Sequence, residues 1–337
     1  MCRTFHLELM HIIVESHIPF IRDVFESRGH TVDYLPPEEI TNNTVRHADA
    51  LIIRTRTKAD AALLHGSSVK RVATATIGTD HIDMEYCRRN GIRVSNAPGC
   101  NAPAVAQYVL SSICRLRQDY SPTDITLGIV GVGHVGSIVR RWASAAGMKV
   151  MLCDPPRALA EGPDEFVTLD AVARHADIIT FHTPLDNSTR HMADDSFFSL
   201  CRHKPMIINA ARGPVVDTHA LLRAIKDGRI SDAVIDCWEN EPDIDLSLLH
   251  AAAIATPHIA GYSFEGKQRA TAMTAAAIDP AVKLIMPSVA HAPSLSEISA
   301  SYDPLSDTAA LTAHPEKFEI LRNTYDYRHE PAADIRP

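Results

Sequence analysis

The segment Gly131–Gly136, which reads GVGHVG, constrains the fold of this chain more than any other feature. It lies between an apolar run, Ile125–Val130, and a stretch with helical spacing, Val135–Ala146. In a strand–GxGxxG–helix unit the glycines permit a tight turn, close approach of the backbone to a pyrophosphate and packing of helix on strand. The helix N-terminus also offers free N–H groups to that anion. The sequence therefore predicts a dinucleotide-binding turn, with cofactor contacts at Gly131, Gly133, His134, Val135 and Gly136.

Asp154 follows the next predicted strand, Lys149–Cys153, about 20 residues beyond the glycine turn. A carboxylate at this place accepts hydrogen bonds from the ribose diol and repels a 2′-phosphate, so it favours NAD over NADP. Arg157 lies close to it in the sequence and offers a partner for such a phosphate, which keeps NADP open as the alternative.

Short strand-like runs alternate with helical stretches along most of the chain, which is the pattern of parallel α/β sheets. The predicted strands are His11–Glu15, Ala50–Arg54, Arg71–Ile77, Arg93–Asn96, Ile125–Val130, Lys149–Cys153, Ile178–His182, Met206–Ala210, Ala233–Asp236 and Ile254–Thr256. The predicted helices are Phe20–Arg28, Ala102–Leu116, Val135–Ala146, Thr218–Lys226, an alanine-rich helix ending near Ile278, and Pro315–Asn323.

This order predicts an α/β fold with two Rossmann-like domains around a cleft. We expect a discontinuous substrate domain, residues 10–100 and 257–279, and an NAD-binding domain, residues 101–256. Residues 280–337 form a small C-terminal segment, and residues 1–9 are expected to be disordered.

Composition excludes several classes of protein. The formal net charge of −8 argues against nucleic acid or an anionic membrane as the main partner. The seven cysteines are scattered and never spaced as CxxC, which is typical of reduced thiols in the cytoplasm. The histidines lack an HExxH pattern, so no metal site is predicted. No apolar run reaches the roughly 18 residues that a membrane span requires.

Polar residues follow several predicted strands of the second block, where open α/β sheets bind their ligands. Oxidation of a 2-hydroxy acid needs a base, a cation for the carboxylate and a hydride acceptor. His258 suits the base because imidazole titrates near neutral pH, and Glu241 suits its partner. The planar fork of Arg212 suits the carboxylate. Each residue alone also fits a surface loop, but their order behind the dinucleotide motif predicts a catalytic set.

These segments and the glycine turn resemble the D-isomer-specific 2-hydroxyacid dehydrogenase family, from about His11 to Gly266. The resemblance implies an NAD-dependent oxidoreductase whose catalytic residues are Arg212, Glu241 and His258. It places cofactor contacts at Asp154, Thr183, Asp236 and Gly261. One departure is Gln107, which stands where the family usually has Glu.

A narrower resemblance is to the branch of this family that oxidises 4-phospho-D-erythronate to a 2-oxo acid on the route to pyridoxal phosphate. It is carried by Thr74–His81, Ala97–Ala102, Leu152–Arg157 and His258–Lys267. It implies substrate contacts at Thr55, Thr76 and Tyr262, and a homodimer formed through a segment like Pro315–Arg328.

The segment Arg54–Lys58 supports a substrate of this kind independently of the resemblance. It lies at the end of a predicted strand and carries basic and hydroxyl groups. Such a loop, Arg54 included, can bind a second anion on the substrate, and each charge-assisted hydrogen bond contributes about 1.5–3 kcal/mol. The alternatives are a family member acting on 3-phosphoglycerate or on glyoxylate/hydroxypyruvate, and a corepressor-like protein that senses NAD. The acidic chain argues against the last of these.

Overall fold

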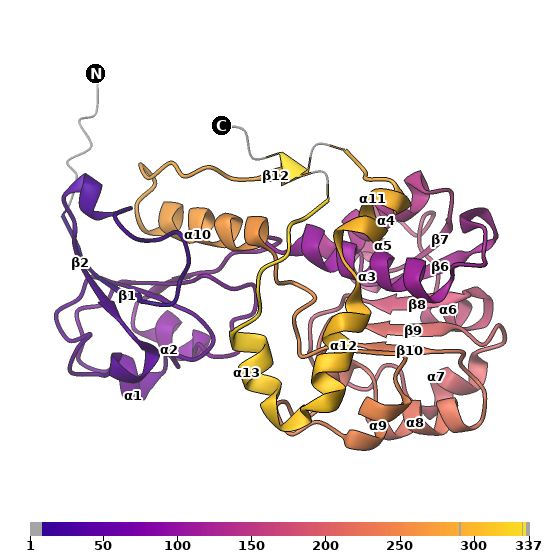
Figure 1. Cartoon of the computed structure of the whole chain (residues 1–337). Coiled ribbons are helices and arrows are strands. Elements are labelled where there is room, and N and C mark those ends of the chain that lie inside the picture. The colour runs from indigo at the N-terminus through magenta and orange to yellow at the C-terminus, as the bar shows by residue number, and fades with distance from the viewer. Residues whose placement is uncertain (1–8, 290, 332, 335–337) are drawn as a thin grey trace. The chain divides into compact units, whose positions relative to one another are not determined.

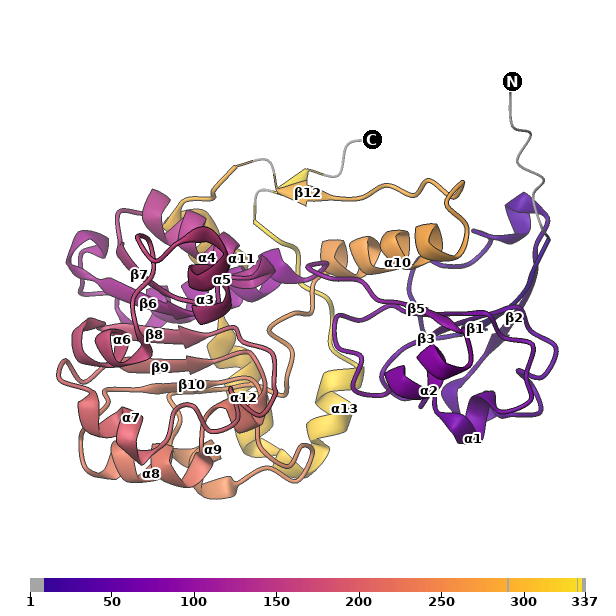
Figure 2. The ribbon, with the colours of Figure 1, turned by 180° about the vertical axis from the view of Figure 1, so that it is seen from behind.

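A computed structural model describes residues 9–289, 291–331 and 333–334. The chain divides into two compact units (Figures 1 and 2). The first unit holds the residues up to Cys100 together with Glu265–Ser288, and the second holds Asn101–Phe264 and Val289–Asp334. Each contains a parallel sheet covered by helices, so the predicted α/β class with two Rossmann-like units is confirmed. Residues 1–8, most of the segment expected to be disordered, lie outside the described residues.

The first unit is built on a five-stranded parallel sheet in the order β2-β1-β3-β4-β5. Its strands are β1 (His11–Glu15), β2 (Thr31–Leu35), β3 (Ala50–Ile53), β4 (Arg71–Thr74) and β5 (Arg93–Ser95). One face packs against helices α1 (Ala61–Leu64) and α2 (Met84–Arg89), and the other against α10 (Phe264–Ile278). The strand order reverses between β1 and β3, which are neighbours although β2 lies between them in the sequence.

The predicted helix Phe20–Arg28 is wrong. Phe20 and Asp23 adopt left-handed φ angles of 61° and 63°, so only a 3-10 turn, Glu26–Arg28, forms before Gly29. The strand β2 that follows was not predicted. It lies at the edge of its sheet with none of its residues fully buried, and a mixed run such as TVDYL gives little hydrophobic signal.

The second unit is built on a six-stranded parallel sheet in the order β11-β10-β9-β8-β6-β7. Its strands are β6 (Thr126–Val130), β7 (Lys149–Cys153), β8 (Ile178–Phe181), β9 (Met206–Asn209), β10 (Ala233–Ile235) and β11 (Ile254–Ala255). The chain runs from β6 outward to β7 and then returns to the other side of β6 as β8. Ligands of open α/β sheets bind at such a reversal, outside the carboxyl ends of the strands.

Helices cover both faces of this sheet because neighbouring strand residues point to opposite sides. Ile178 packs with one layer of helices and Ile179 with the other. The first layer contains α3 (Ala102–Leu116), α4 (His134–Ala145) and α11 (Leu295–Ser301). The second contains α6 (Leu169–His175), α7 (Asp195–Leu200), α8 (Thr218–Lys226) and α9 (Leu246–Ala251). The predicted helix Ala102–Leu116 is present at the expected bounds and buried along most of its length.

The C-terminal part of the second unit contains α11, α12 (Pro304–Ala313) and α13 (Phe318–Asn323). The short strand β12 (Ser288–Val289) begins at the last described residue of the first unit, and β13 (Ala333–Asp334) ends the second. Helix α12 lies beside β11, where Thr308 Oγ1 accepts a hydrogen bond of 3.1 Å from the backbone of Ala255. The predicted helical piece Pro315–Asn323 is a 3-10 turn, Pro315–Lys317, followed by α13. Helices α11 and α12 were not predicted.

The compact units divide at Glu265 and Val289, whereas the sequence suggested boundaries at residues 257 and 280. Residues 257–264 therefore group with the sheet of the second unit, and so does Val289–Asp334. The assignment of residues 280–337 to dimerisation stays a prediction. Among the described residues, no helix has the length and apolar content to cross a membrane.

Candidate active site

The glycine turn lies at the strand reversal between β6 and β8. Gly131 has a φ of 87°, and a Cβ there would approach the backbone carbonyl carbon of His182 to 2.7 Å. A Cβ on Gly136 would collide with the Gly131 carbonyl oxygen. A Cβ on Gly133, in contrast, would meet no atom within 4 Å, and Gly133 immediately precedes α4. Two glycines therefore serve internal packing, and the middle one leaves room beside a helix N-terminus, which fits a bound pyrophosphate.

Asp154 completes this turn from the end of β7. Its Oδ2 accepts a 2.8 Å hydrogen bond from Val132 N, and its Oδ1 caps α5 (Pro155–Glu161) by accepting from Arg157 N at 3.1 Å. The Arg157 guanidinium is itself engaged, with Nε and Nη2 each 2.7 Å from Glu161 and Nη1 2.7 Å from Val132 O. A carboxylate beside the turn and an arginine already paired with Glu161 fit NAD better than NADP.

The turn that carries Arg212 follows β9 and is fixed by Asn209, a residue for which no role was predicted. Asn209 is 1% exposed, and its side-chain amide donates to the carbonyls of Arg212 at 3.1 Å and Gly213 at 3.3 Å. A Cβ on Gly213 would collide with the backbone of Trp238. The arginine turn is thereby packed directly onto the segment that leads to Glu241.

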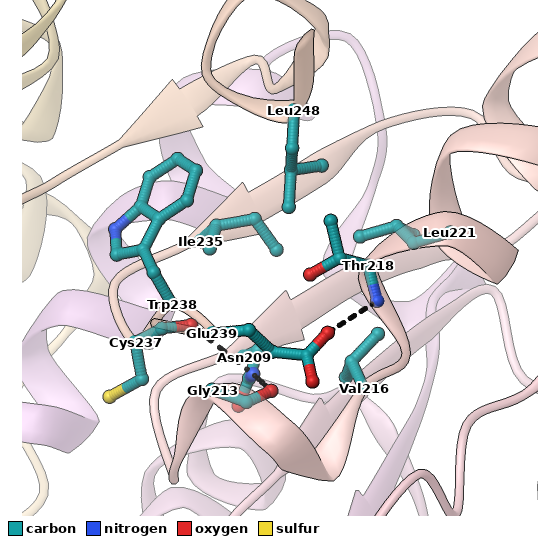
Figure 3. Close-up of a pocket in the computed structure, with 10 residues that line it drawn as sticks. All are labelled: Asn209, Gly213, Val216, Thr218, Leu221, Ile235, Cys237, Trp238, Glu239 and Leu248. Atoms are coloured by element: carbon teal, nitrogen blue, oxygen red, sulfur yellow. Dashed lines mark hydrogen bonds between the residues drawn. The ribbon is translucent and has the colours of Figure 1, made fainter. Parts of the chain in front are cut away.

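A small pocket lies behind this turn, between α8, β10 and Trp238 (Figure 3). Glu239 borders it and accepts a 3.0 Å hydrogen bond from Thr218 N. Even with adjoining open solvent counted, the space in this pocket is about 190 Å³, below the range of about 300–1,000 Å³ that is usual for small-molecule sites. We assign it to packing between the helix and the strand ends, not to the cofactor.

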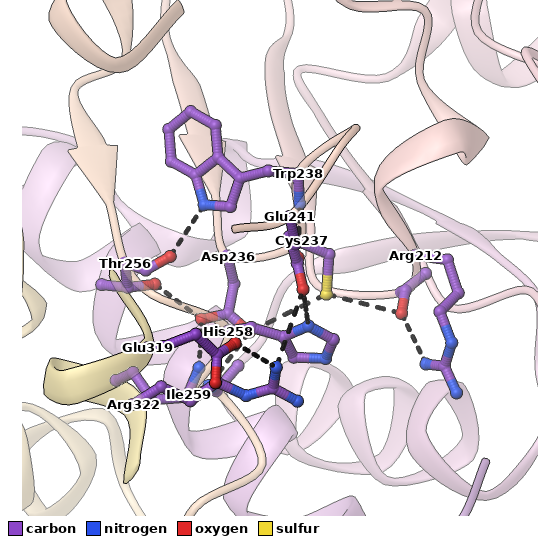
Figure 4. Close-up of polar contacts among 12 residues, drawn as sticks. Arg212, Asp236, Cys237, Trp238, Glu241, Thr256, His258, Ile259, Glu319 and Arg322 are labelled. Atoms are coloured by element: carbon purple, nitrogen blue, oxygen red, sulfur yellow. Dashed lines mark hydrogen bonds and ion pairs between the residues drawn. The ribbon is translucent and has the colours of Figure 1, made fainter. Parts of the chain in front are cut away.

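Glu241 and His258 form a hydrogen-bonded pair at the strand ends (Figure 4). His258 Nδ1 lies 2.8 Å from Glu241 Oε2 and 3.1 Å from Oε1. The Oε1 atom also accepts 2.8 Å from Trp238 N, which fixes the carboxylate. The side chain of His258 is 26% exposed, so part of its ring is open to a ligand. This is the geometry of a base whose tautomer and orientation are set by a carboxylate.

The charges around His258 favour its protonated form. Burial alone lowers the pKa of His258, but its contacts with Cys237 and Glu241 outweigh burial and hold that pKa well above its usual range. Burial raises the pKa of the Cys237 thiol, so Cys237 is neutral at neutral pH and Glu241 is the group that acts. Burial raises the pKa of Glu241, but the charge and hydrogen bond of His258 and the hydrogen bond from Trp238 N outweigh burial and lower that pKa below its usual range.

Asp236 holds the loop that carries His258. Its Oδ1 accepts from Ile259 N and from Thr256 Oγ1, both at 2.7 Å, and its Oδ2 accepts from Ala260 N at 3.0 Å. Burial raises the pKa of this 1% exposed carboxyl. The loop brings His258 to a left-handed φ of 56°. Asp236 was predicted to contact the cofactor, and that role stays a prediction. The structure shows its hydrogen bonds to the loop that carries His258.

The other predicted cofactor positions also lie in the second unit. Thr183 is half-buried just beyond β8, with its hydroxyl 3.8 Å from Met192 Sδ. Gly261 packs against the Asn101 side chain, which a Cβ at Gly261 would meet. Their contacts with a cofactor stay predictions.

The predicted substrate residues of the first unit lie at two strand ends. After β3, Arg54 Nη1 donates to His17 O at 3.1 Å, and Thr55 is exposed. Glu15, which the sequence did not single out, accepts from Arg54 N at 2.8 Å and from Thr57 Oγ1 at 3.0 Å, so it shapes this loop at the reversal of the sheet. After β4, Thr76 Oγ1 lies 2.6 Å from Thr74 Oγ1.

Two arginines of the C-terminal segment reach the loop of His258, and neither was predicted. Arg322 on α13 donates to the Tyr262 hydroxyl at 3.4 Å, and its Nη1 lies 4.0 Å from Glu241 Oε2. Arg328 donates to the carbonyls of Ile259, at 3.0 Å, and Ala260. It also donates to Gln107 Oε1 at 3.0 Å, which gives this glutamine a structural role.

Comparison with known proteins decides the family. Residues 113–260 match the family described as D-isomer specific 2-hydroxyacid dehydrogenase, NAD binding domain. An erythronate-4-phosphate dehydrogenase of Bacteroides thetaiotaomicron is 46% identical to this chain, over 96% of the chain and 98% of that protein. The chain belongs to the D-isomer specific 2-hydroxyacid dehydrogenase family. A second relative in this family, the erythronate-4-phosphate dehydrogenase of Yersinia pestis strain Pestoides F, is 39% identical over 95% of the chain and 93% of the relative.

Solved structures of 2-hydroxyacid dehydrogenases share the fold. The D-lactate dehydrogenase from Aquifex aeolicus, complexed with NAD and lactic acid, has a TM-score of 0.67 and 27% identity, and covers 80% of this chain and 94% of its own. The NAD⁺-bound 3-phosphoglycerate dehydrogenase of Entamoeba histolytica has a TM-score of 0.70 and 26% identity, with 82% and 98% covered. The predictions of family, fold class and NAD as cofactor are confirmed.

Proposed function

We propose that this dehydrogenase oxidises 4-phospho-D-erythronate at C2 to 2-oxo-3-hydroxy-4-phosphobutanoate, with NAD as hydride acceptor. The observation that carries the reaction type is the Glu241–His258 pair, 2.8 Å apart at the strand ends of an NAD-binding unit. The substrate is supported by identity of 46% across 96% of the chain with a protein named erythronate-4-phosphate dehydrogenase. The reaction belongs to the route to pyridoxal phosphate.

In the proposed mechanism His258 takes the C2 hydroxyl proton and Glu241 stabilises the imidazolium that forms. Arg212 binds the substrate carboxylate and polarises the developing C2 carbonyl, since its guanidinium offers a planar pair of donors. Base catalysis of this kind contributes typically about 10²–10⁴-fold. When bound, NAD supplies the hydride acceptor; Gly133, the N-terminus of α4 and Asp154 would hold it.

Selection of a phosphorylated acid is assigned to the Arg54–Lys58 loop, with Thr76 and Tyr262 as further substrate contacts. Thr55, Arg56 and Lys58 are exposed on this loop, and Glu15 fixes its backbone at Arg54. Each charge-assisted hydrogen bond to a phosphate contributes about 1.5–3 kcal/mol, which is enough to distinguish 4-phosphoerythronate from unphosphorylated acids.

The enzyme is proposed to act in the cytoplasm as a homodimer that uses its C-terminal segment. Ile320 on α13 is 58% exposed and offers an apolar side chain to a second copy. Sedimentation of the purified chain tests this directly. A monomer at working concentration would contradict the dimer without affecting the proposed reaction.

The substrate assignment is tested by initial rates of NADH formation with 4-phospho-D-erythronate, D-erythronate and D-3-phosphoglycerate. We expect the highest kcat/KM with the first. Arg54→Met should raise its KM and leave kcat/KM for D-erythronate nearly unchanged, because only the phosphate loses a partner. Higher kcat/KM with 3-phosphoglycerate would replace the proposed substrate, and no turnover with any acid would favour an NAD-sensing binding protein.

A further inference from the structure

Three side chains with different metal-binding groups come together at the proposed base, which is one of them. A thiol, a carboxylate and an imidazole are contributed by Cys237, Glu241 and His258, and their potential ligand atoms all lie within 4.8 Å of one another (Figure 4). The mechanism proposed above uses Glu241 and His258 but gives no role to Cys237. The group was not predicted, since its members come together only when the segment after β10 meets the loop after β11.

We propose that Cys237, Glu241 and His258 form an inhibitory site for a thiophilic divalent cation of the Zn²⁺ class. The ion would take the place of the proton between His258 and Glu241. The site itself rests on the geometry of these three residues. Only its inhibitory effect rests on the proposed function, because that effect requires His258 to be the base.

The spacing of the three donors suits a tetrahedral ion after a small adjustment. With metal–sulfur, metal–nitrogen and metal–oxygen distances of about 2.3, 2.0 and 2.1 Å, tetrahedral ligands lie about 3.4–3.6 Å apart. The His258 nitrogen and Glu241 oxygen start closer than this, at 2.8 Å, because a proton joins them. Replacing the proton by a metal ion moves these two atoms apart by well under 1 Å and draws the sulfur inward.

The donor set selects the kind of ion. Thiolate and imidazole bind Zn²⁺, Co²⁺ or Cd²⁺, whereas Mg²⁺ and Ca²⁺ require oxygen ligands in greater number. Cys237 is 2% exposed and lies at the inner side, while the 26% exposed His258 provides the open side through which an ion enters. Three protein ligands leave a fourth position for water, as in other open zinc sites.

Binding exchanges protons for the metal ion. The Cys237 thiol loses its proton to become a thiolate, and a protonated His258 loses its imidazolium proton, so up to two protons are released for each Zn²⁺ bound. The thiol also gives up its 3.5 Å hydrogen bond to Ala211 O. With both imidazole and carboxylate coordinated, His258 cannot accept the substrate proton, and turnover stops.

The test measures turnover of the full-length enzyme in chelator and then in rising free Zn²⁺, with Mg²⁺ as the comparison ion. Cys237→Ala removes the proposed ligand, and Cys201→Ala removes another buried thiol of the same unit as the matched control. We expect Zn²⁺ to inhibit the wild type and Cys201→Ala alike. In Cys237→Ala the half-inhibiting concentration should rise by more than roughly tenfold, the scale at which even outer-shell partners of a metal ligand act.

Co²⁺ titration gives a readout that does not depend on activity. The wild type should show thiolate-to-cobalt charge-transfer absorption, and Cys237→Ala should lack it. Equal zinc inhibition of both enzymes, or no thiolate absorption in the wild type, would overturn the site. A Cys237-dependent cobalt band without loss of turnover would instead overturn the inhibitory effect and contradict the role of His258. Should Cys237→Ala fold poorly, the wild-type cobalt spectrum decides alone.

Discussion

Glu241 Oε2 lies 2.8 Å from Nδ1 of His258, and Trp238 N holds the same carboxylate from its other side. The imidazole is therefore oriented by a carboxylate that is itself fixed by the backbone. This arrangement lets His258 hold a proton strongly enough to act as base during oxidation and as acid during the reverse reaction.

Glu241→Gln should shift the pH dependence of the enzyme. Oxidation requires neutral His258, so kcat/KM rises as pH increases through the pKa of His258, which Glu241 raises above its usual range. Without that charge the pKa falls, and the rise should move to lower pH. The reverse reduction requires the imidazolium and should lose activity at lower pH than in the wild type. Glu239→Gln, which alters a pair with His191, is the control; an identical shift in both variants would contradict the account.

His258→Ala should lower kcat by about 10²–10⁴-fold while NAD binding is retained. The matched control is His191→Ala, because His191 also has a left-handed φ and also pairs with a glutamate. Stopped-flow kinetics measure turnover, and quenching of the protein's tryptophan fluorescence during titration with NAD measures cofactor binding. Together they separate an effect on catalysis from an effect on binding. Wild-type turnover in His258→Ala would remove this residue from the mechanism.

Alanine at the first two motif glycines should act on different properties. Gly131→Ala places a Cβ 2.7 Å from the His182 backbone at a φ of 87°, so the free energy of unfolding should fall by about 1–3 kcal/mol. Gly133→Ala meets nothing within 4 Å, so stability should persist while NAD binds more weakly. Urea unfolding and NAD titration of both variants provide the comparison. Equal loss of stability would show that Gly133 also serves packing.

Asp236→Asn should loosen the loop that carries His258. The carboxylate accepts hydrogen bonds from Ile259 N, Ala260 N and Thr256, and an amide can replace only part of them. Charge-assisted hydrogen bonds are worth about 1.5–3 kcal/mol each, so we expect a loss of roughly 3 kcal/mol in the free energy of unfolding together with lower kcat. The exposed Asp227→Asn is the control. Unchanged stability in Asp236→Asn would refute the bracing role.

Local patterns allowed the second unit to be predicted well. The strands and the glycine turn from Ile125 onward depend on neighbouring residues, so apolar runs and glycine spacing identify them. The helix predicted at Phe20–Arg28 does not form because Phe20 and Asp23 adopt left-handed φ angles. The apolar spacing of this segment does not reveal those angles. Helices α11 and α12 were missed because their buried side chains, such as Ile298 and Leu311, are few in a polar segment.

Residues whose partners are remote in the sequence could not be predicted. Asn209 looks like an ordinary polar strand end until the Arg212 turn folds over it. Arg322 lies 60 residues from Tyr262, whose hydroxyl it contacts, and Arg328 lies 69 residues from Ile259, whose carbonyl it contacts. Cys237 joins Glu241 and His258 only through the meeting of two strand ends.

The most direct test of the proposed reaction uses 4-phospho-D-erythronate carrying deuterium at C2. We expect mass spectrometry to find the deuterium in the NADH formed and to identify the carbon product as 2-oxo-3-hydroxy-4-phosphobutanoate. His258→Ala should form neither product at a comparable rate. NADH without deuterium, or no NADH from this acid while another 2-hydroxy acid is oxidised, would contradict it.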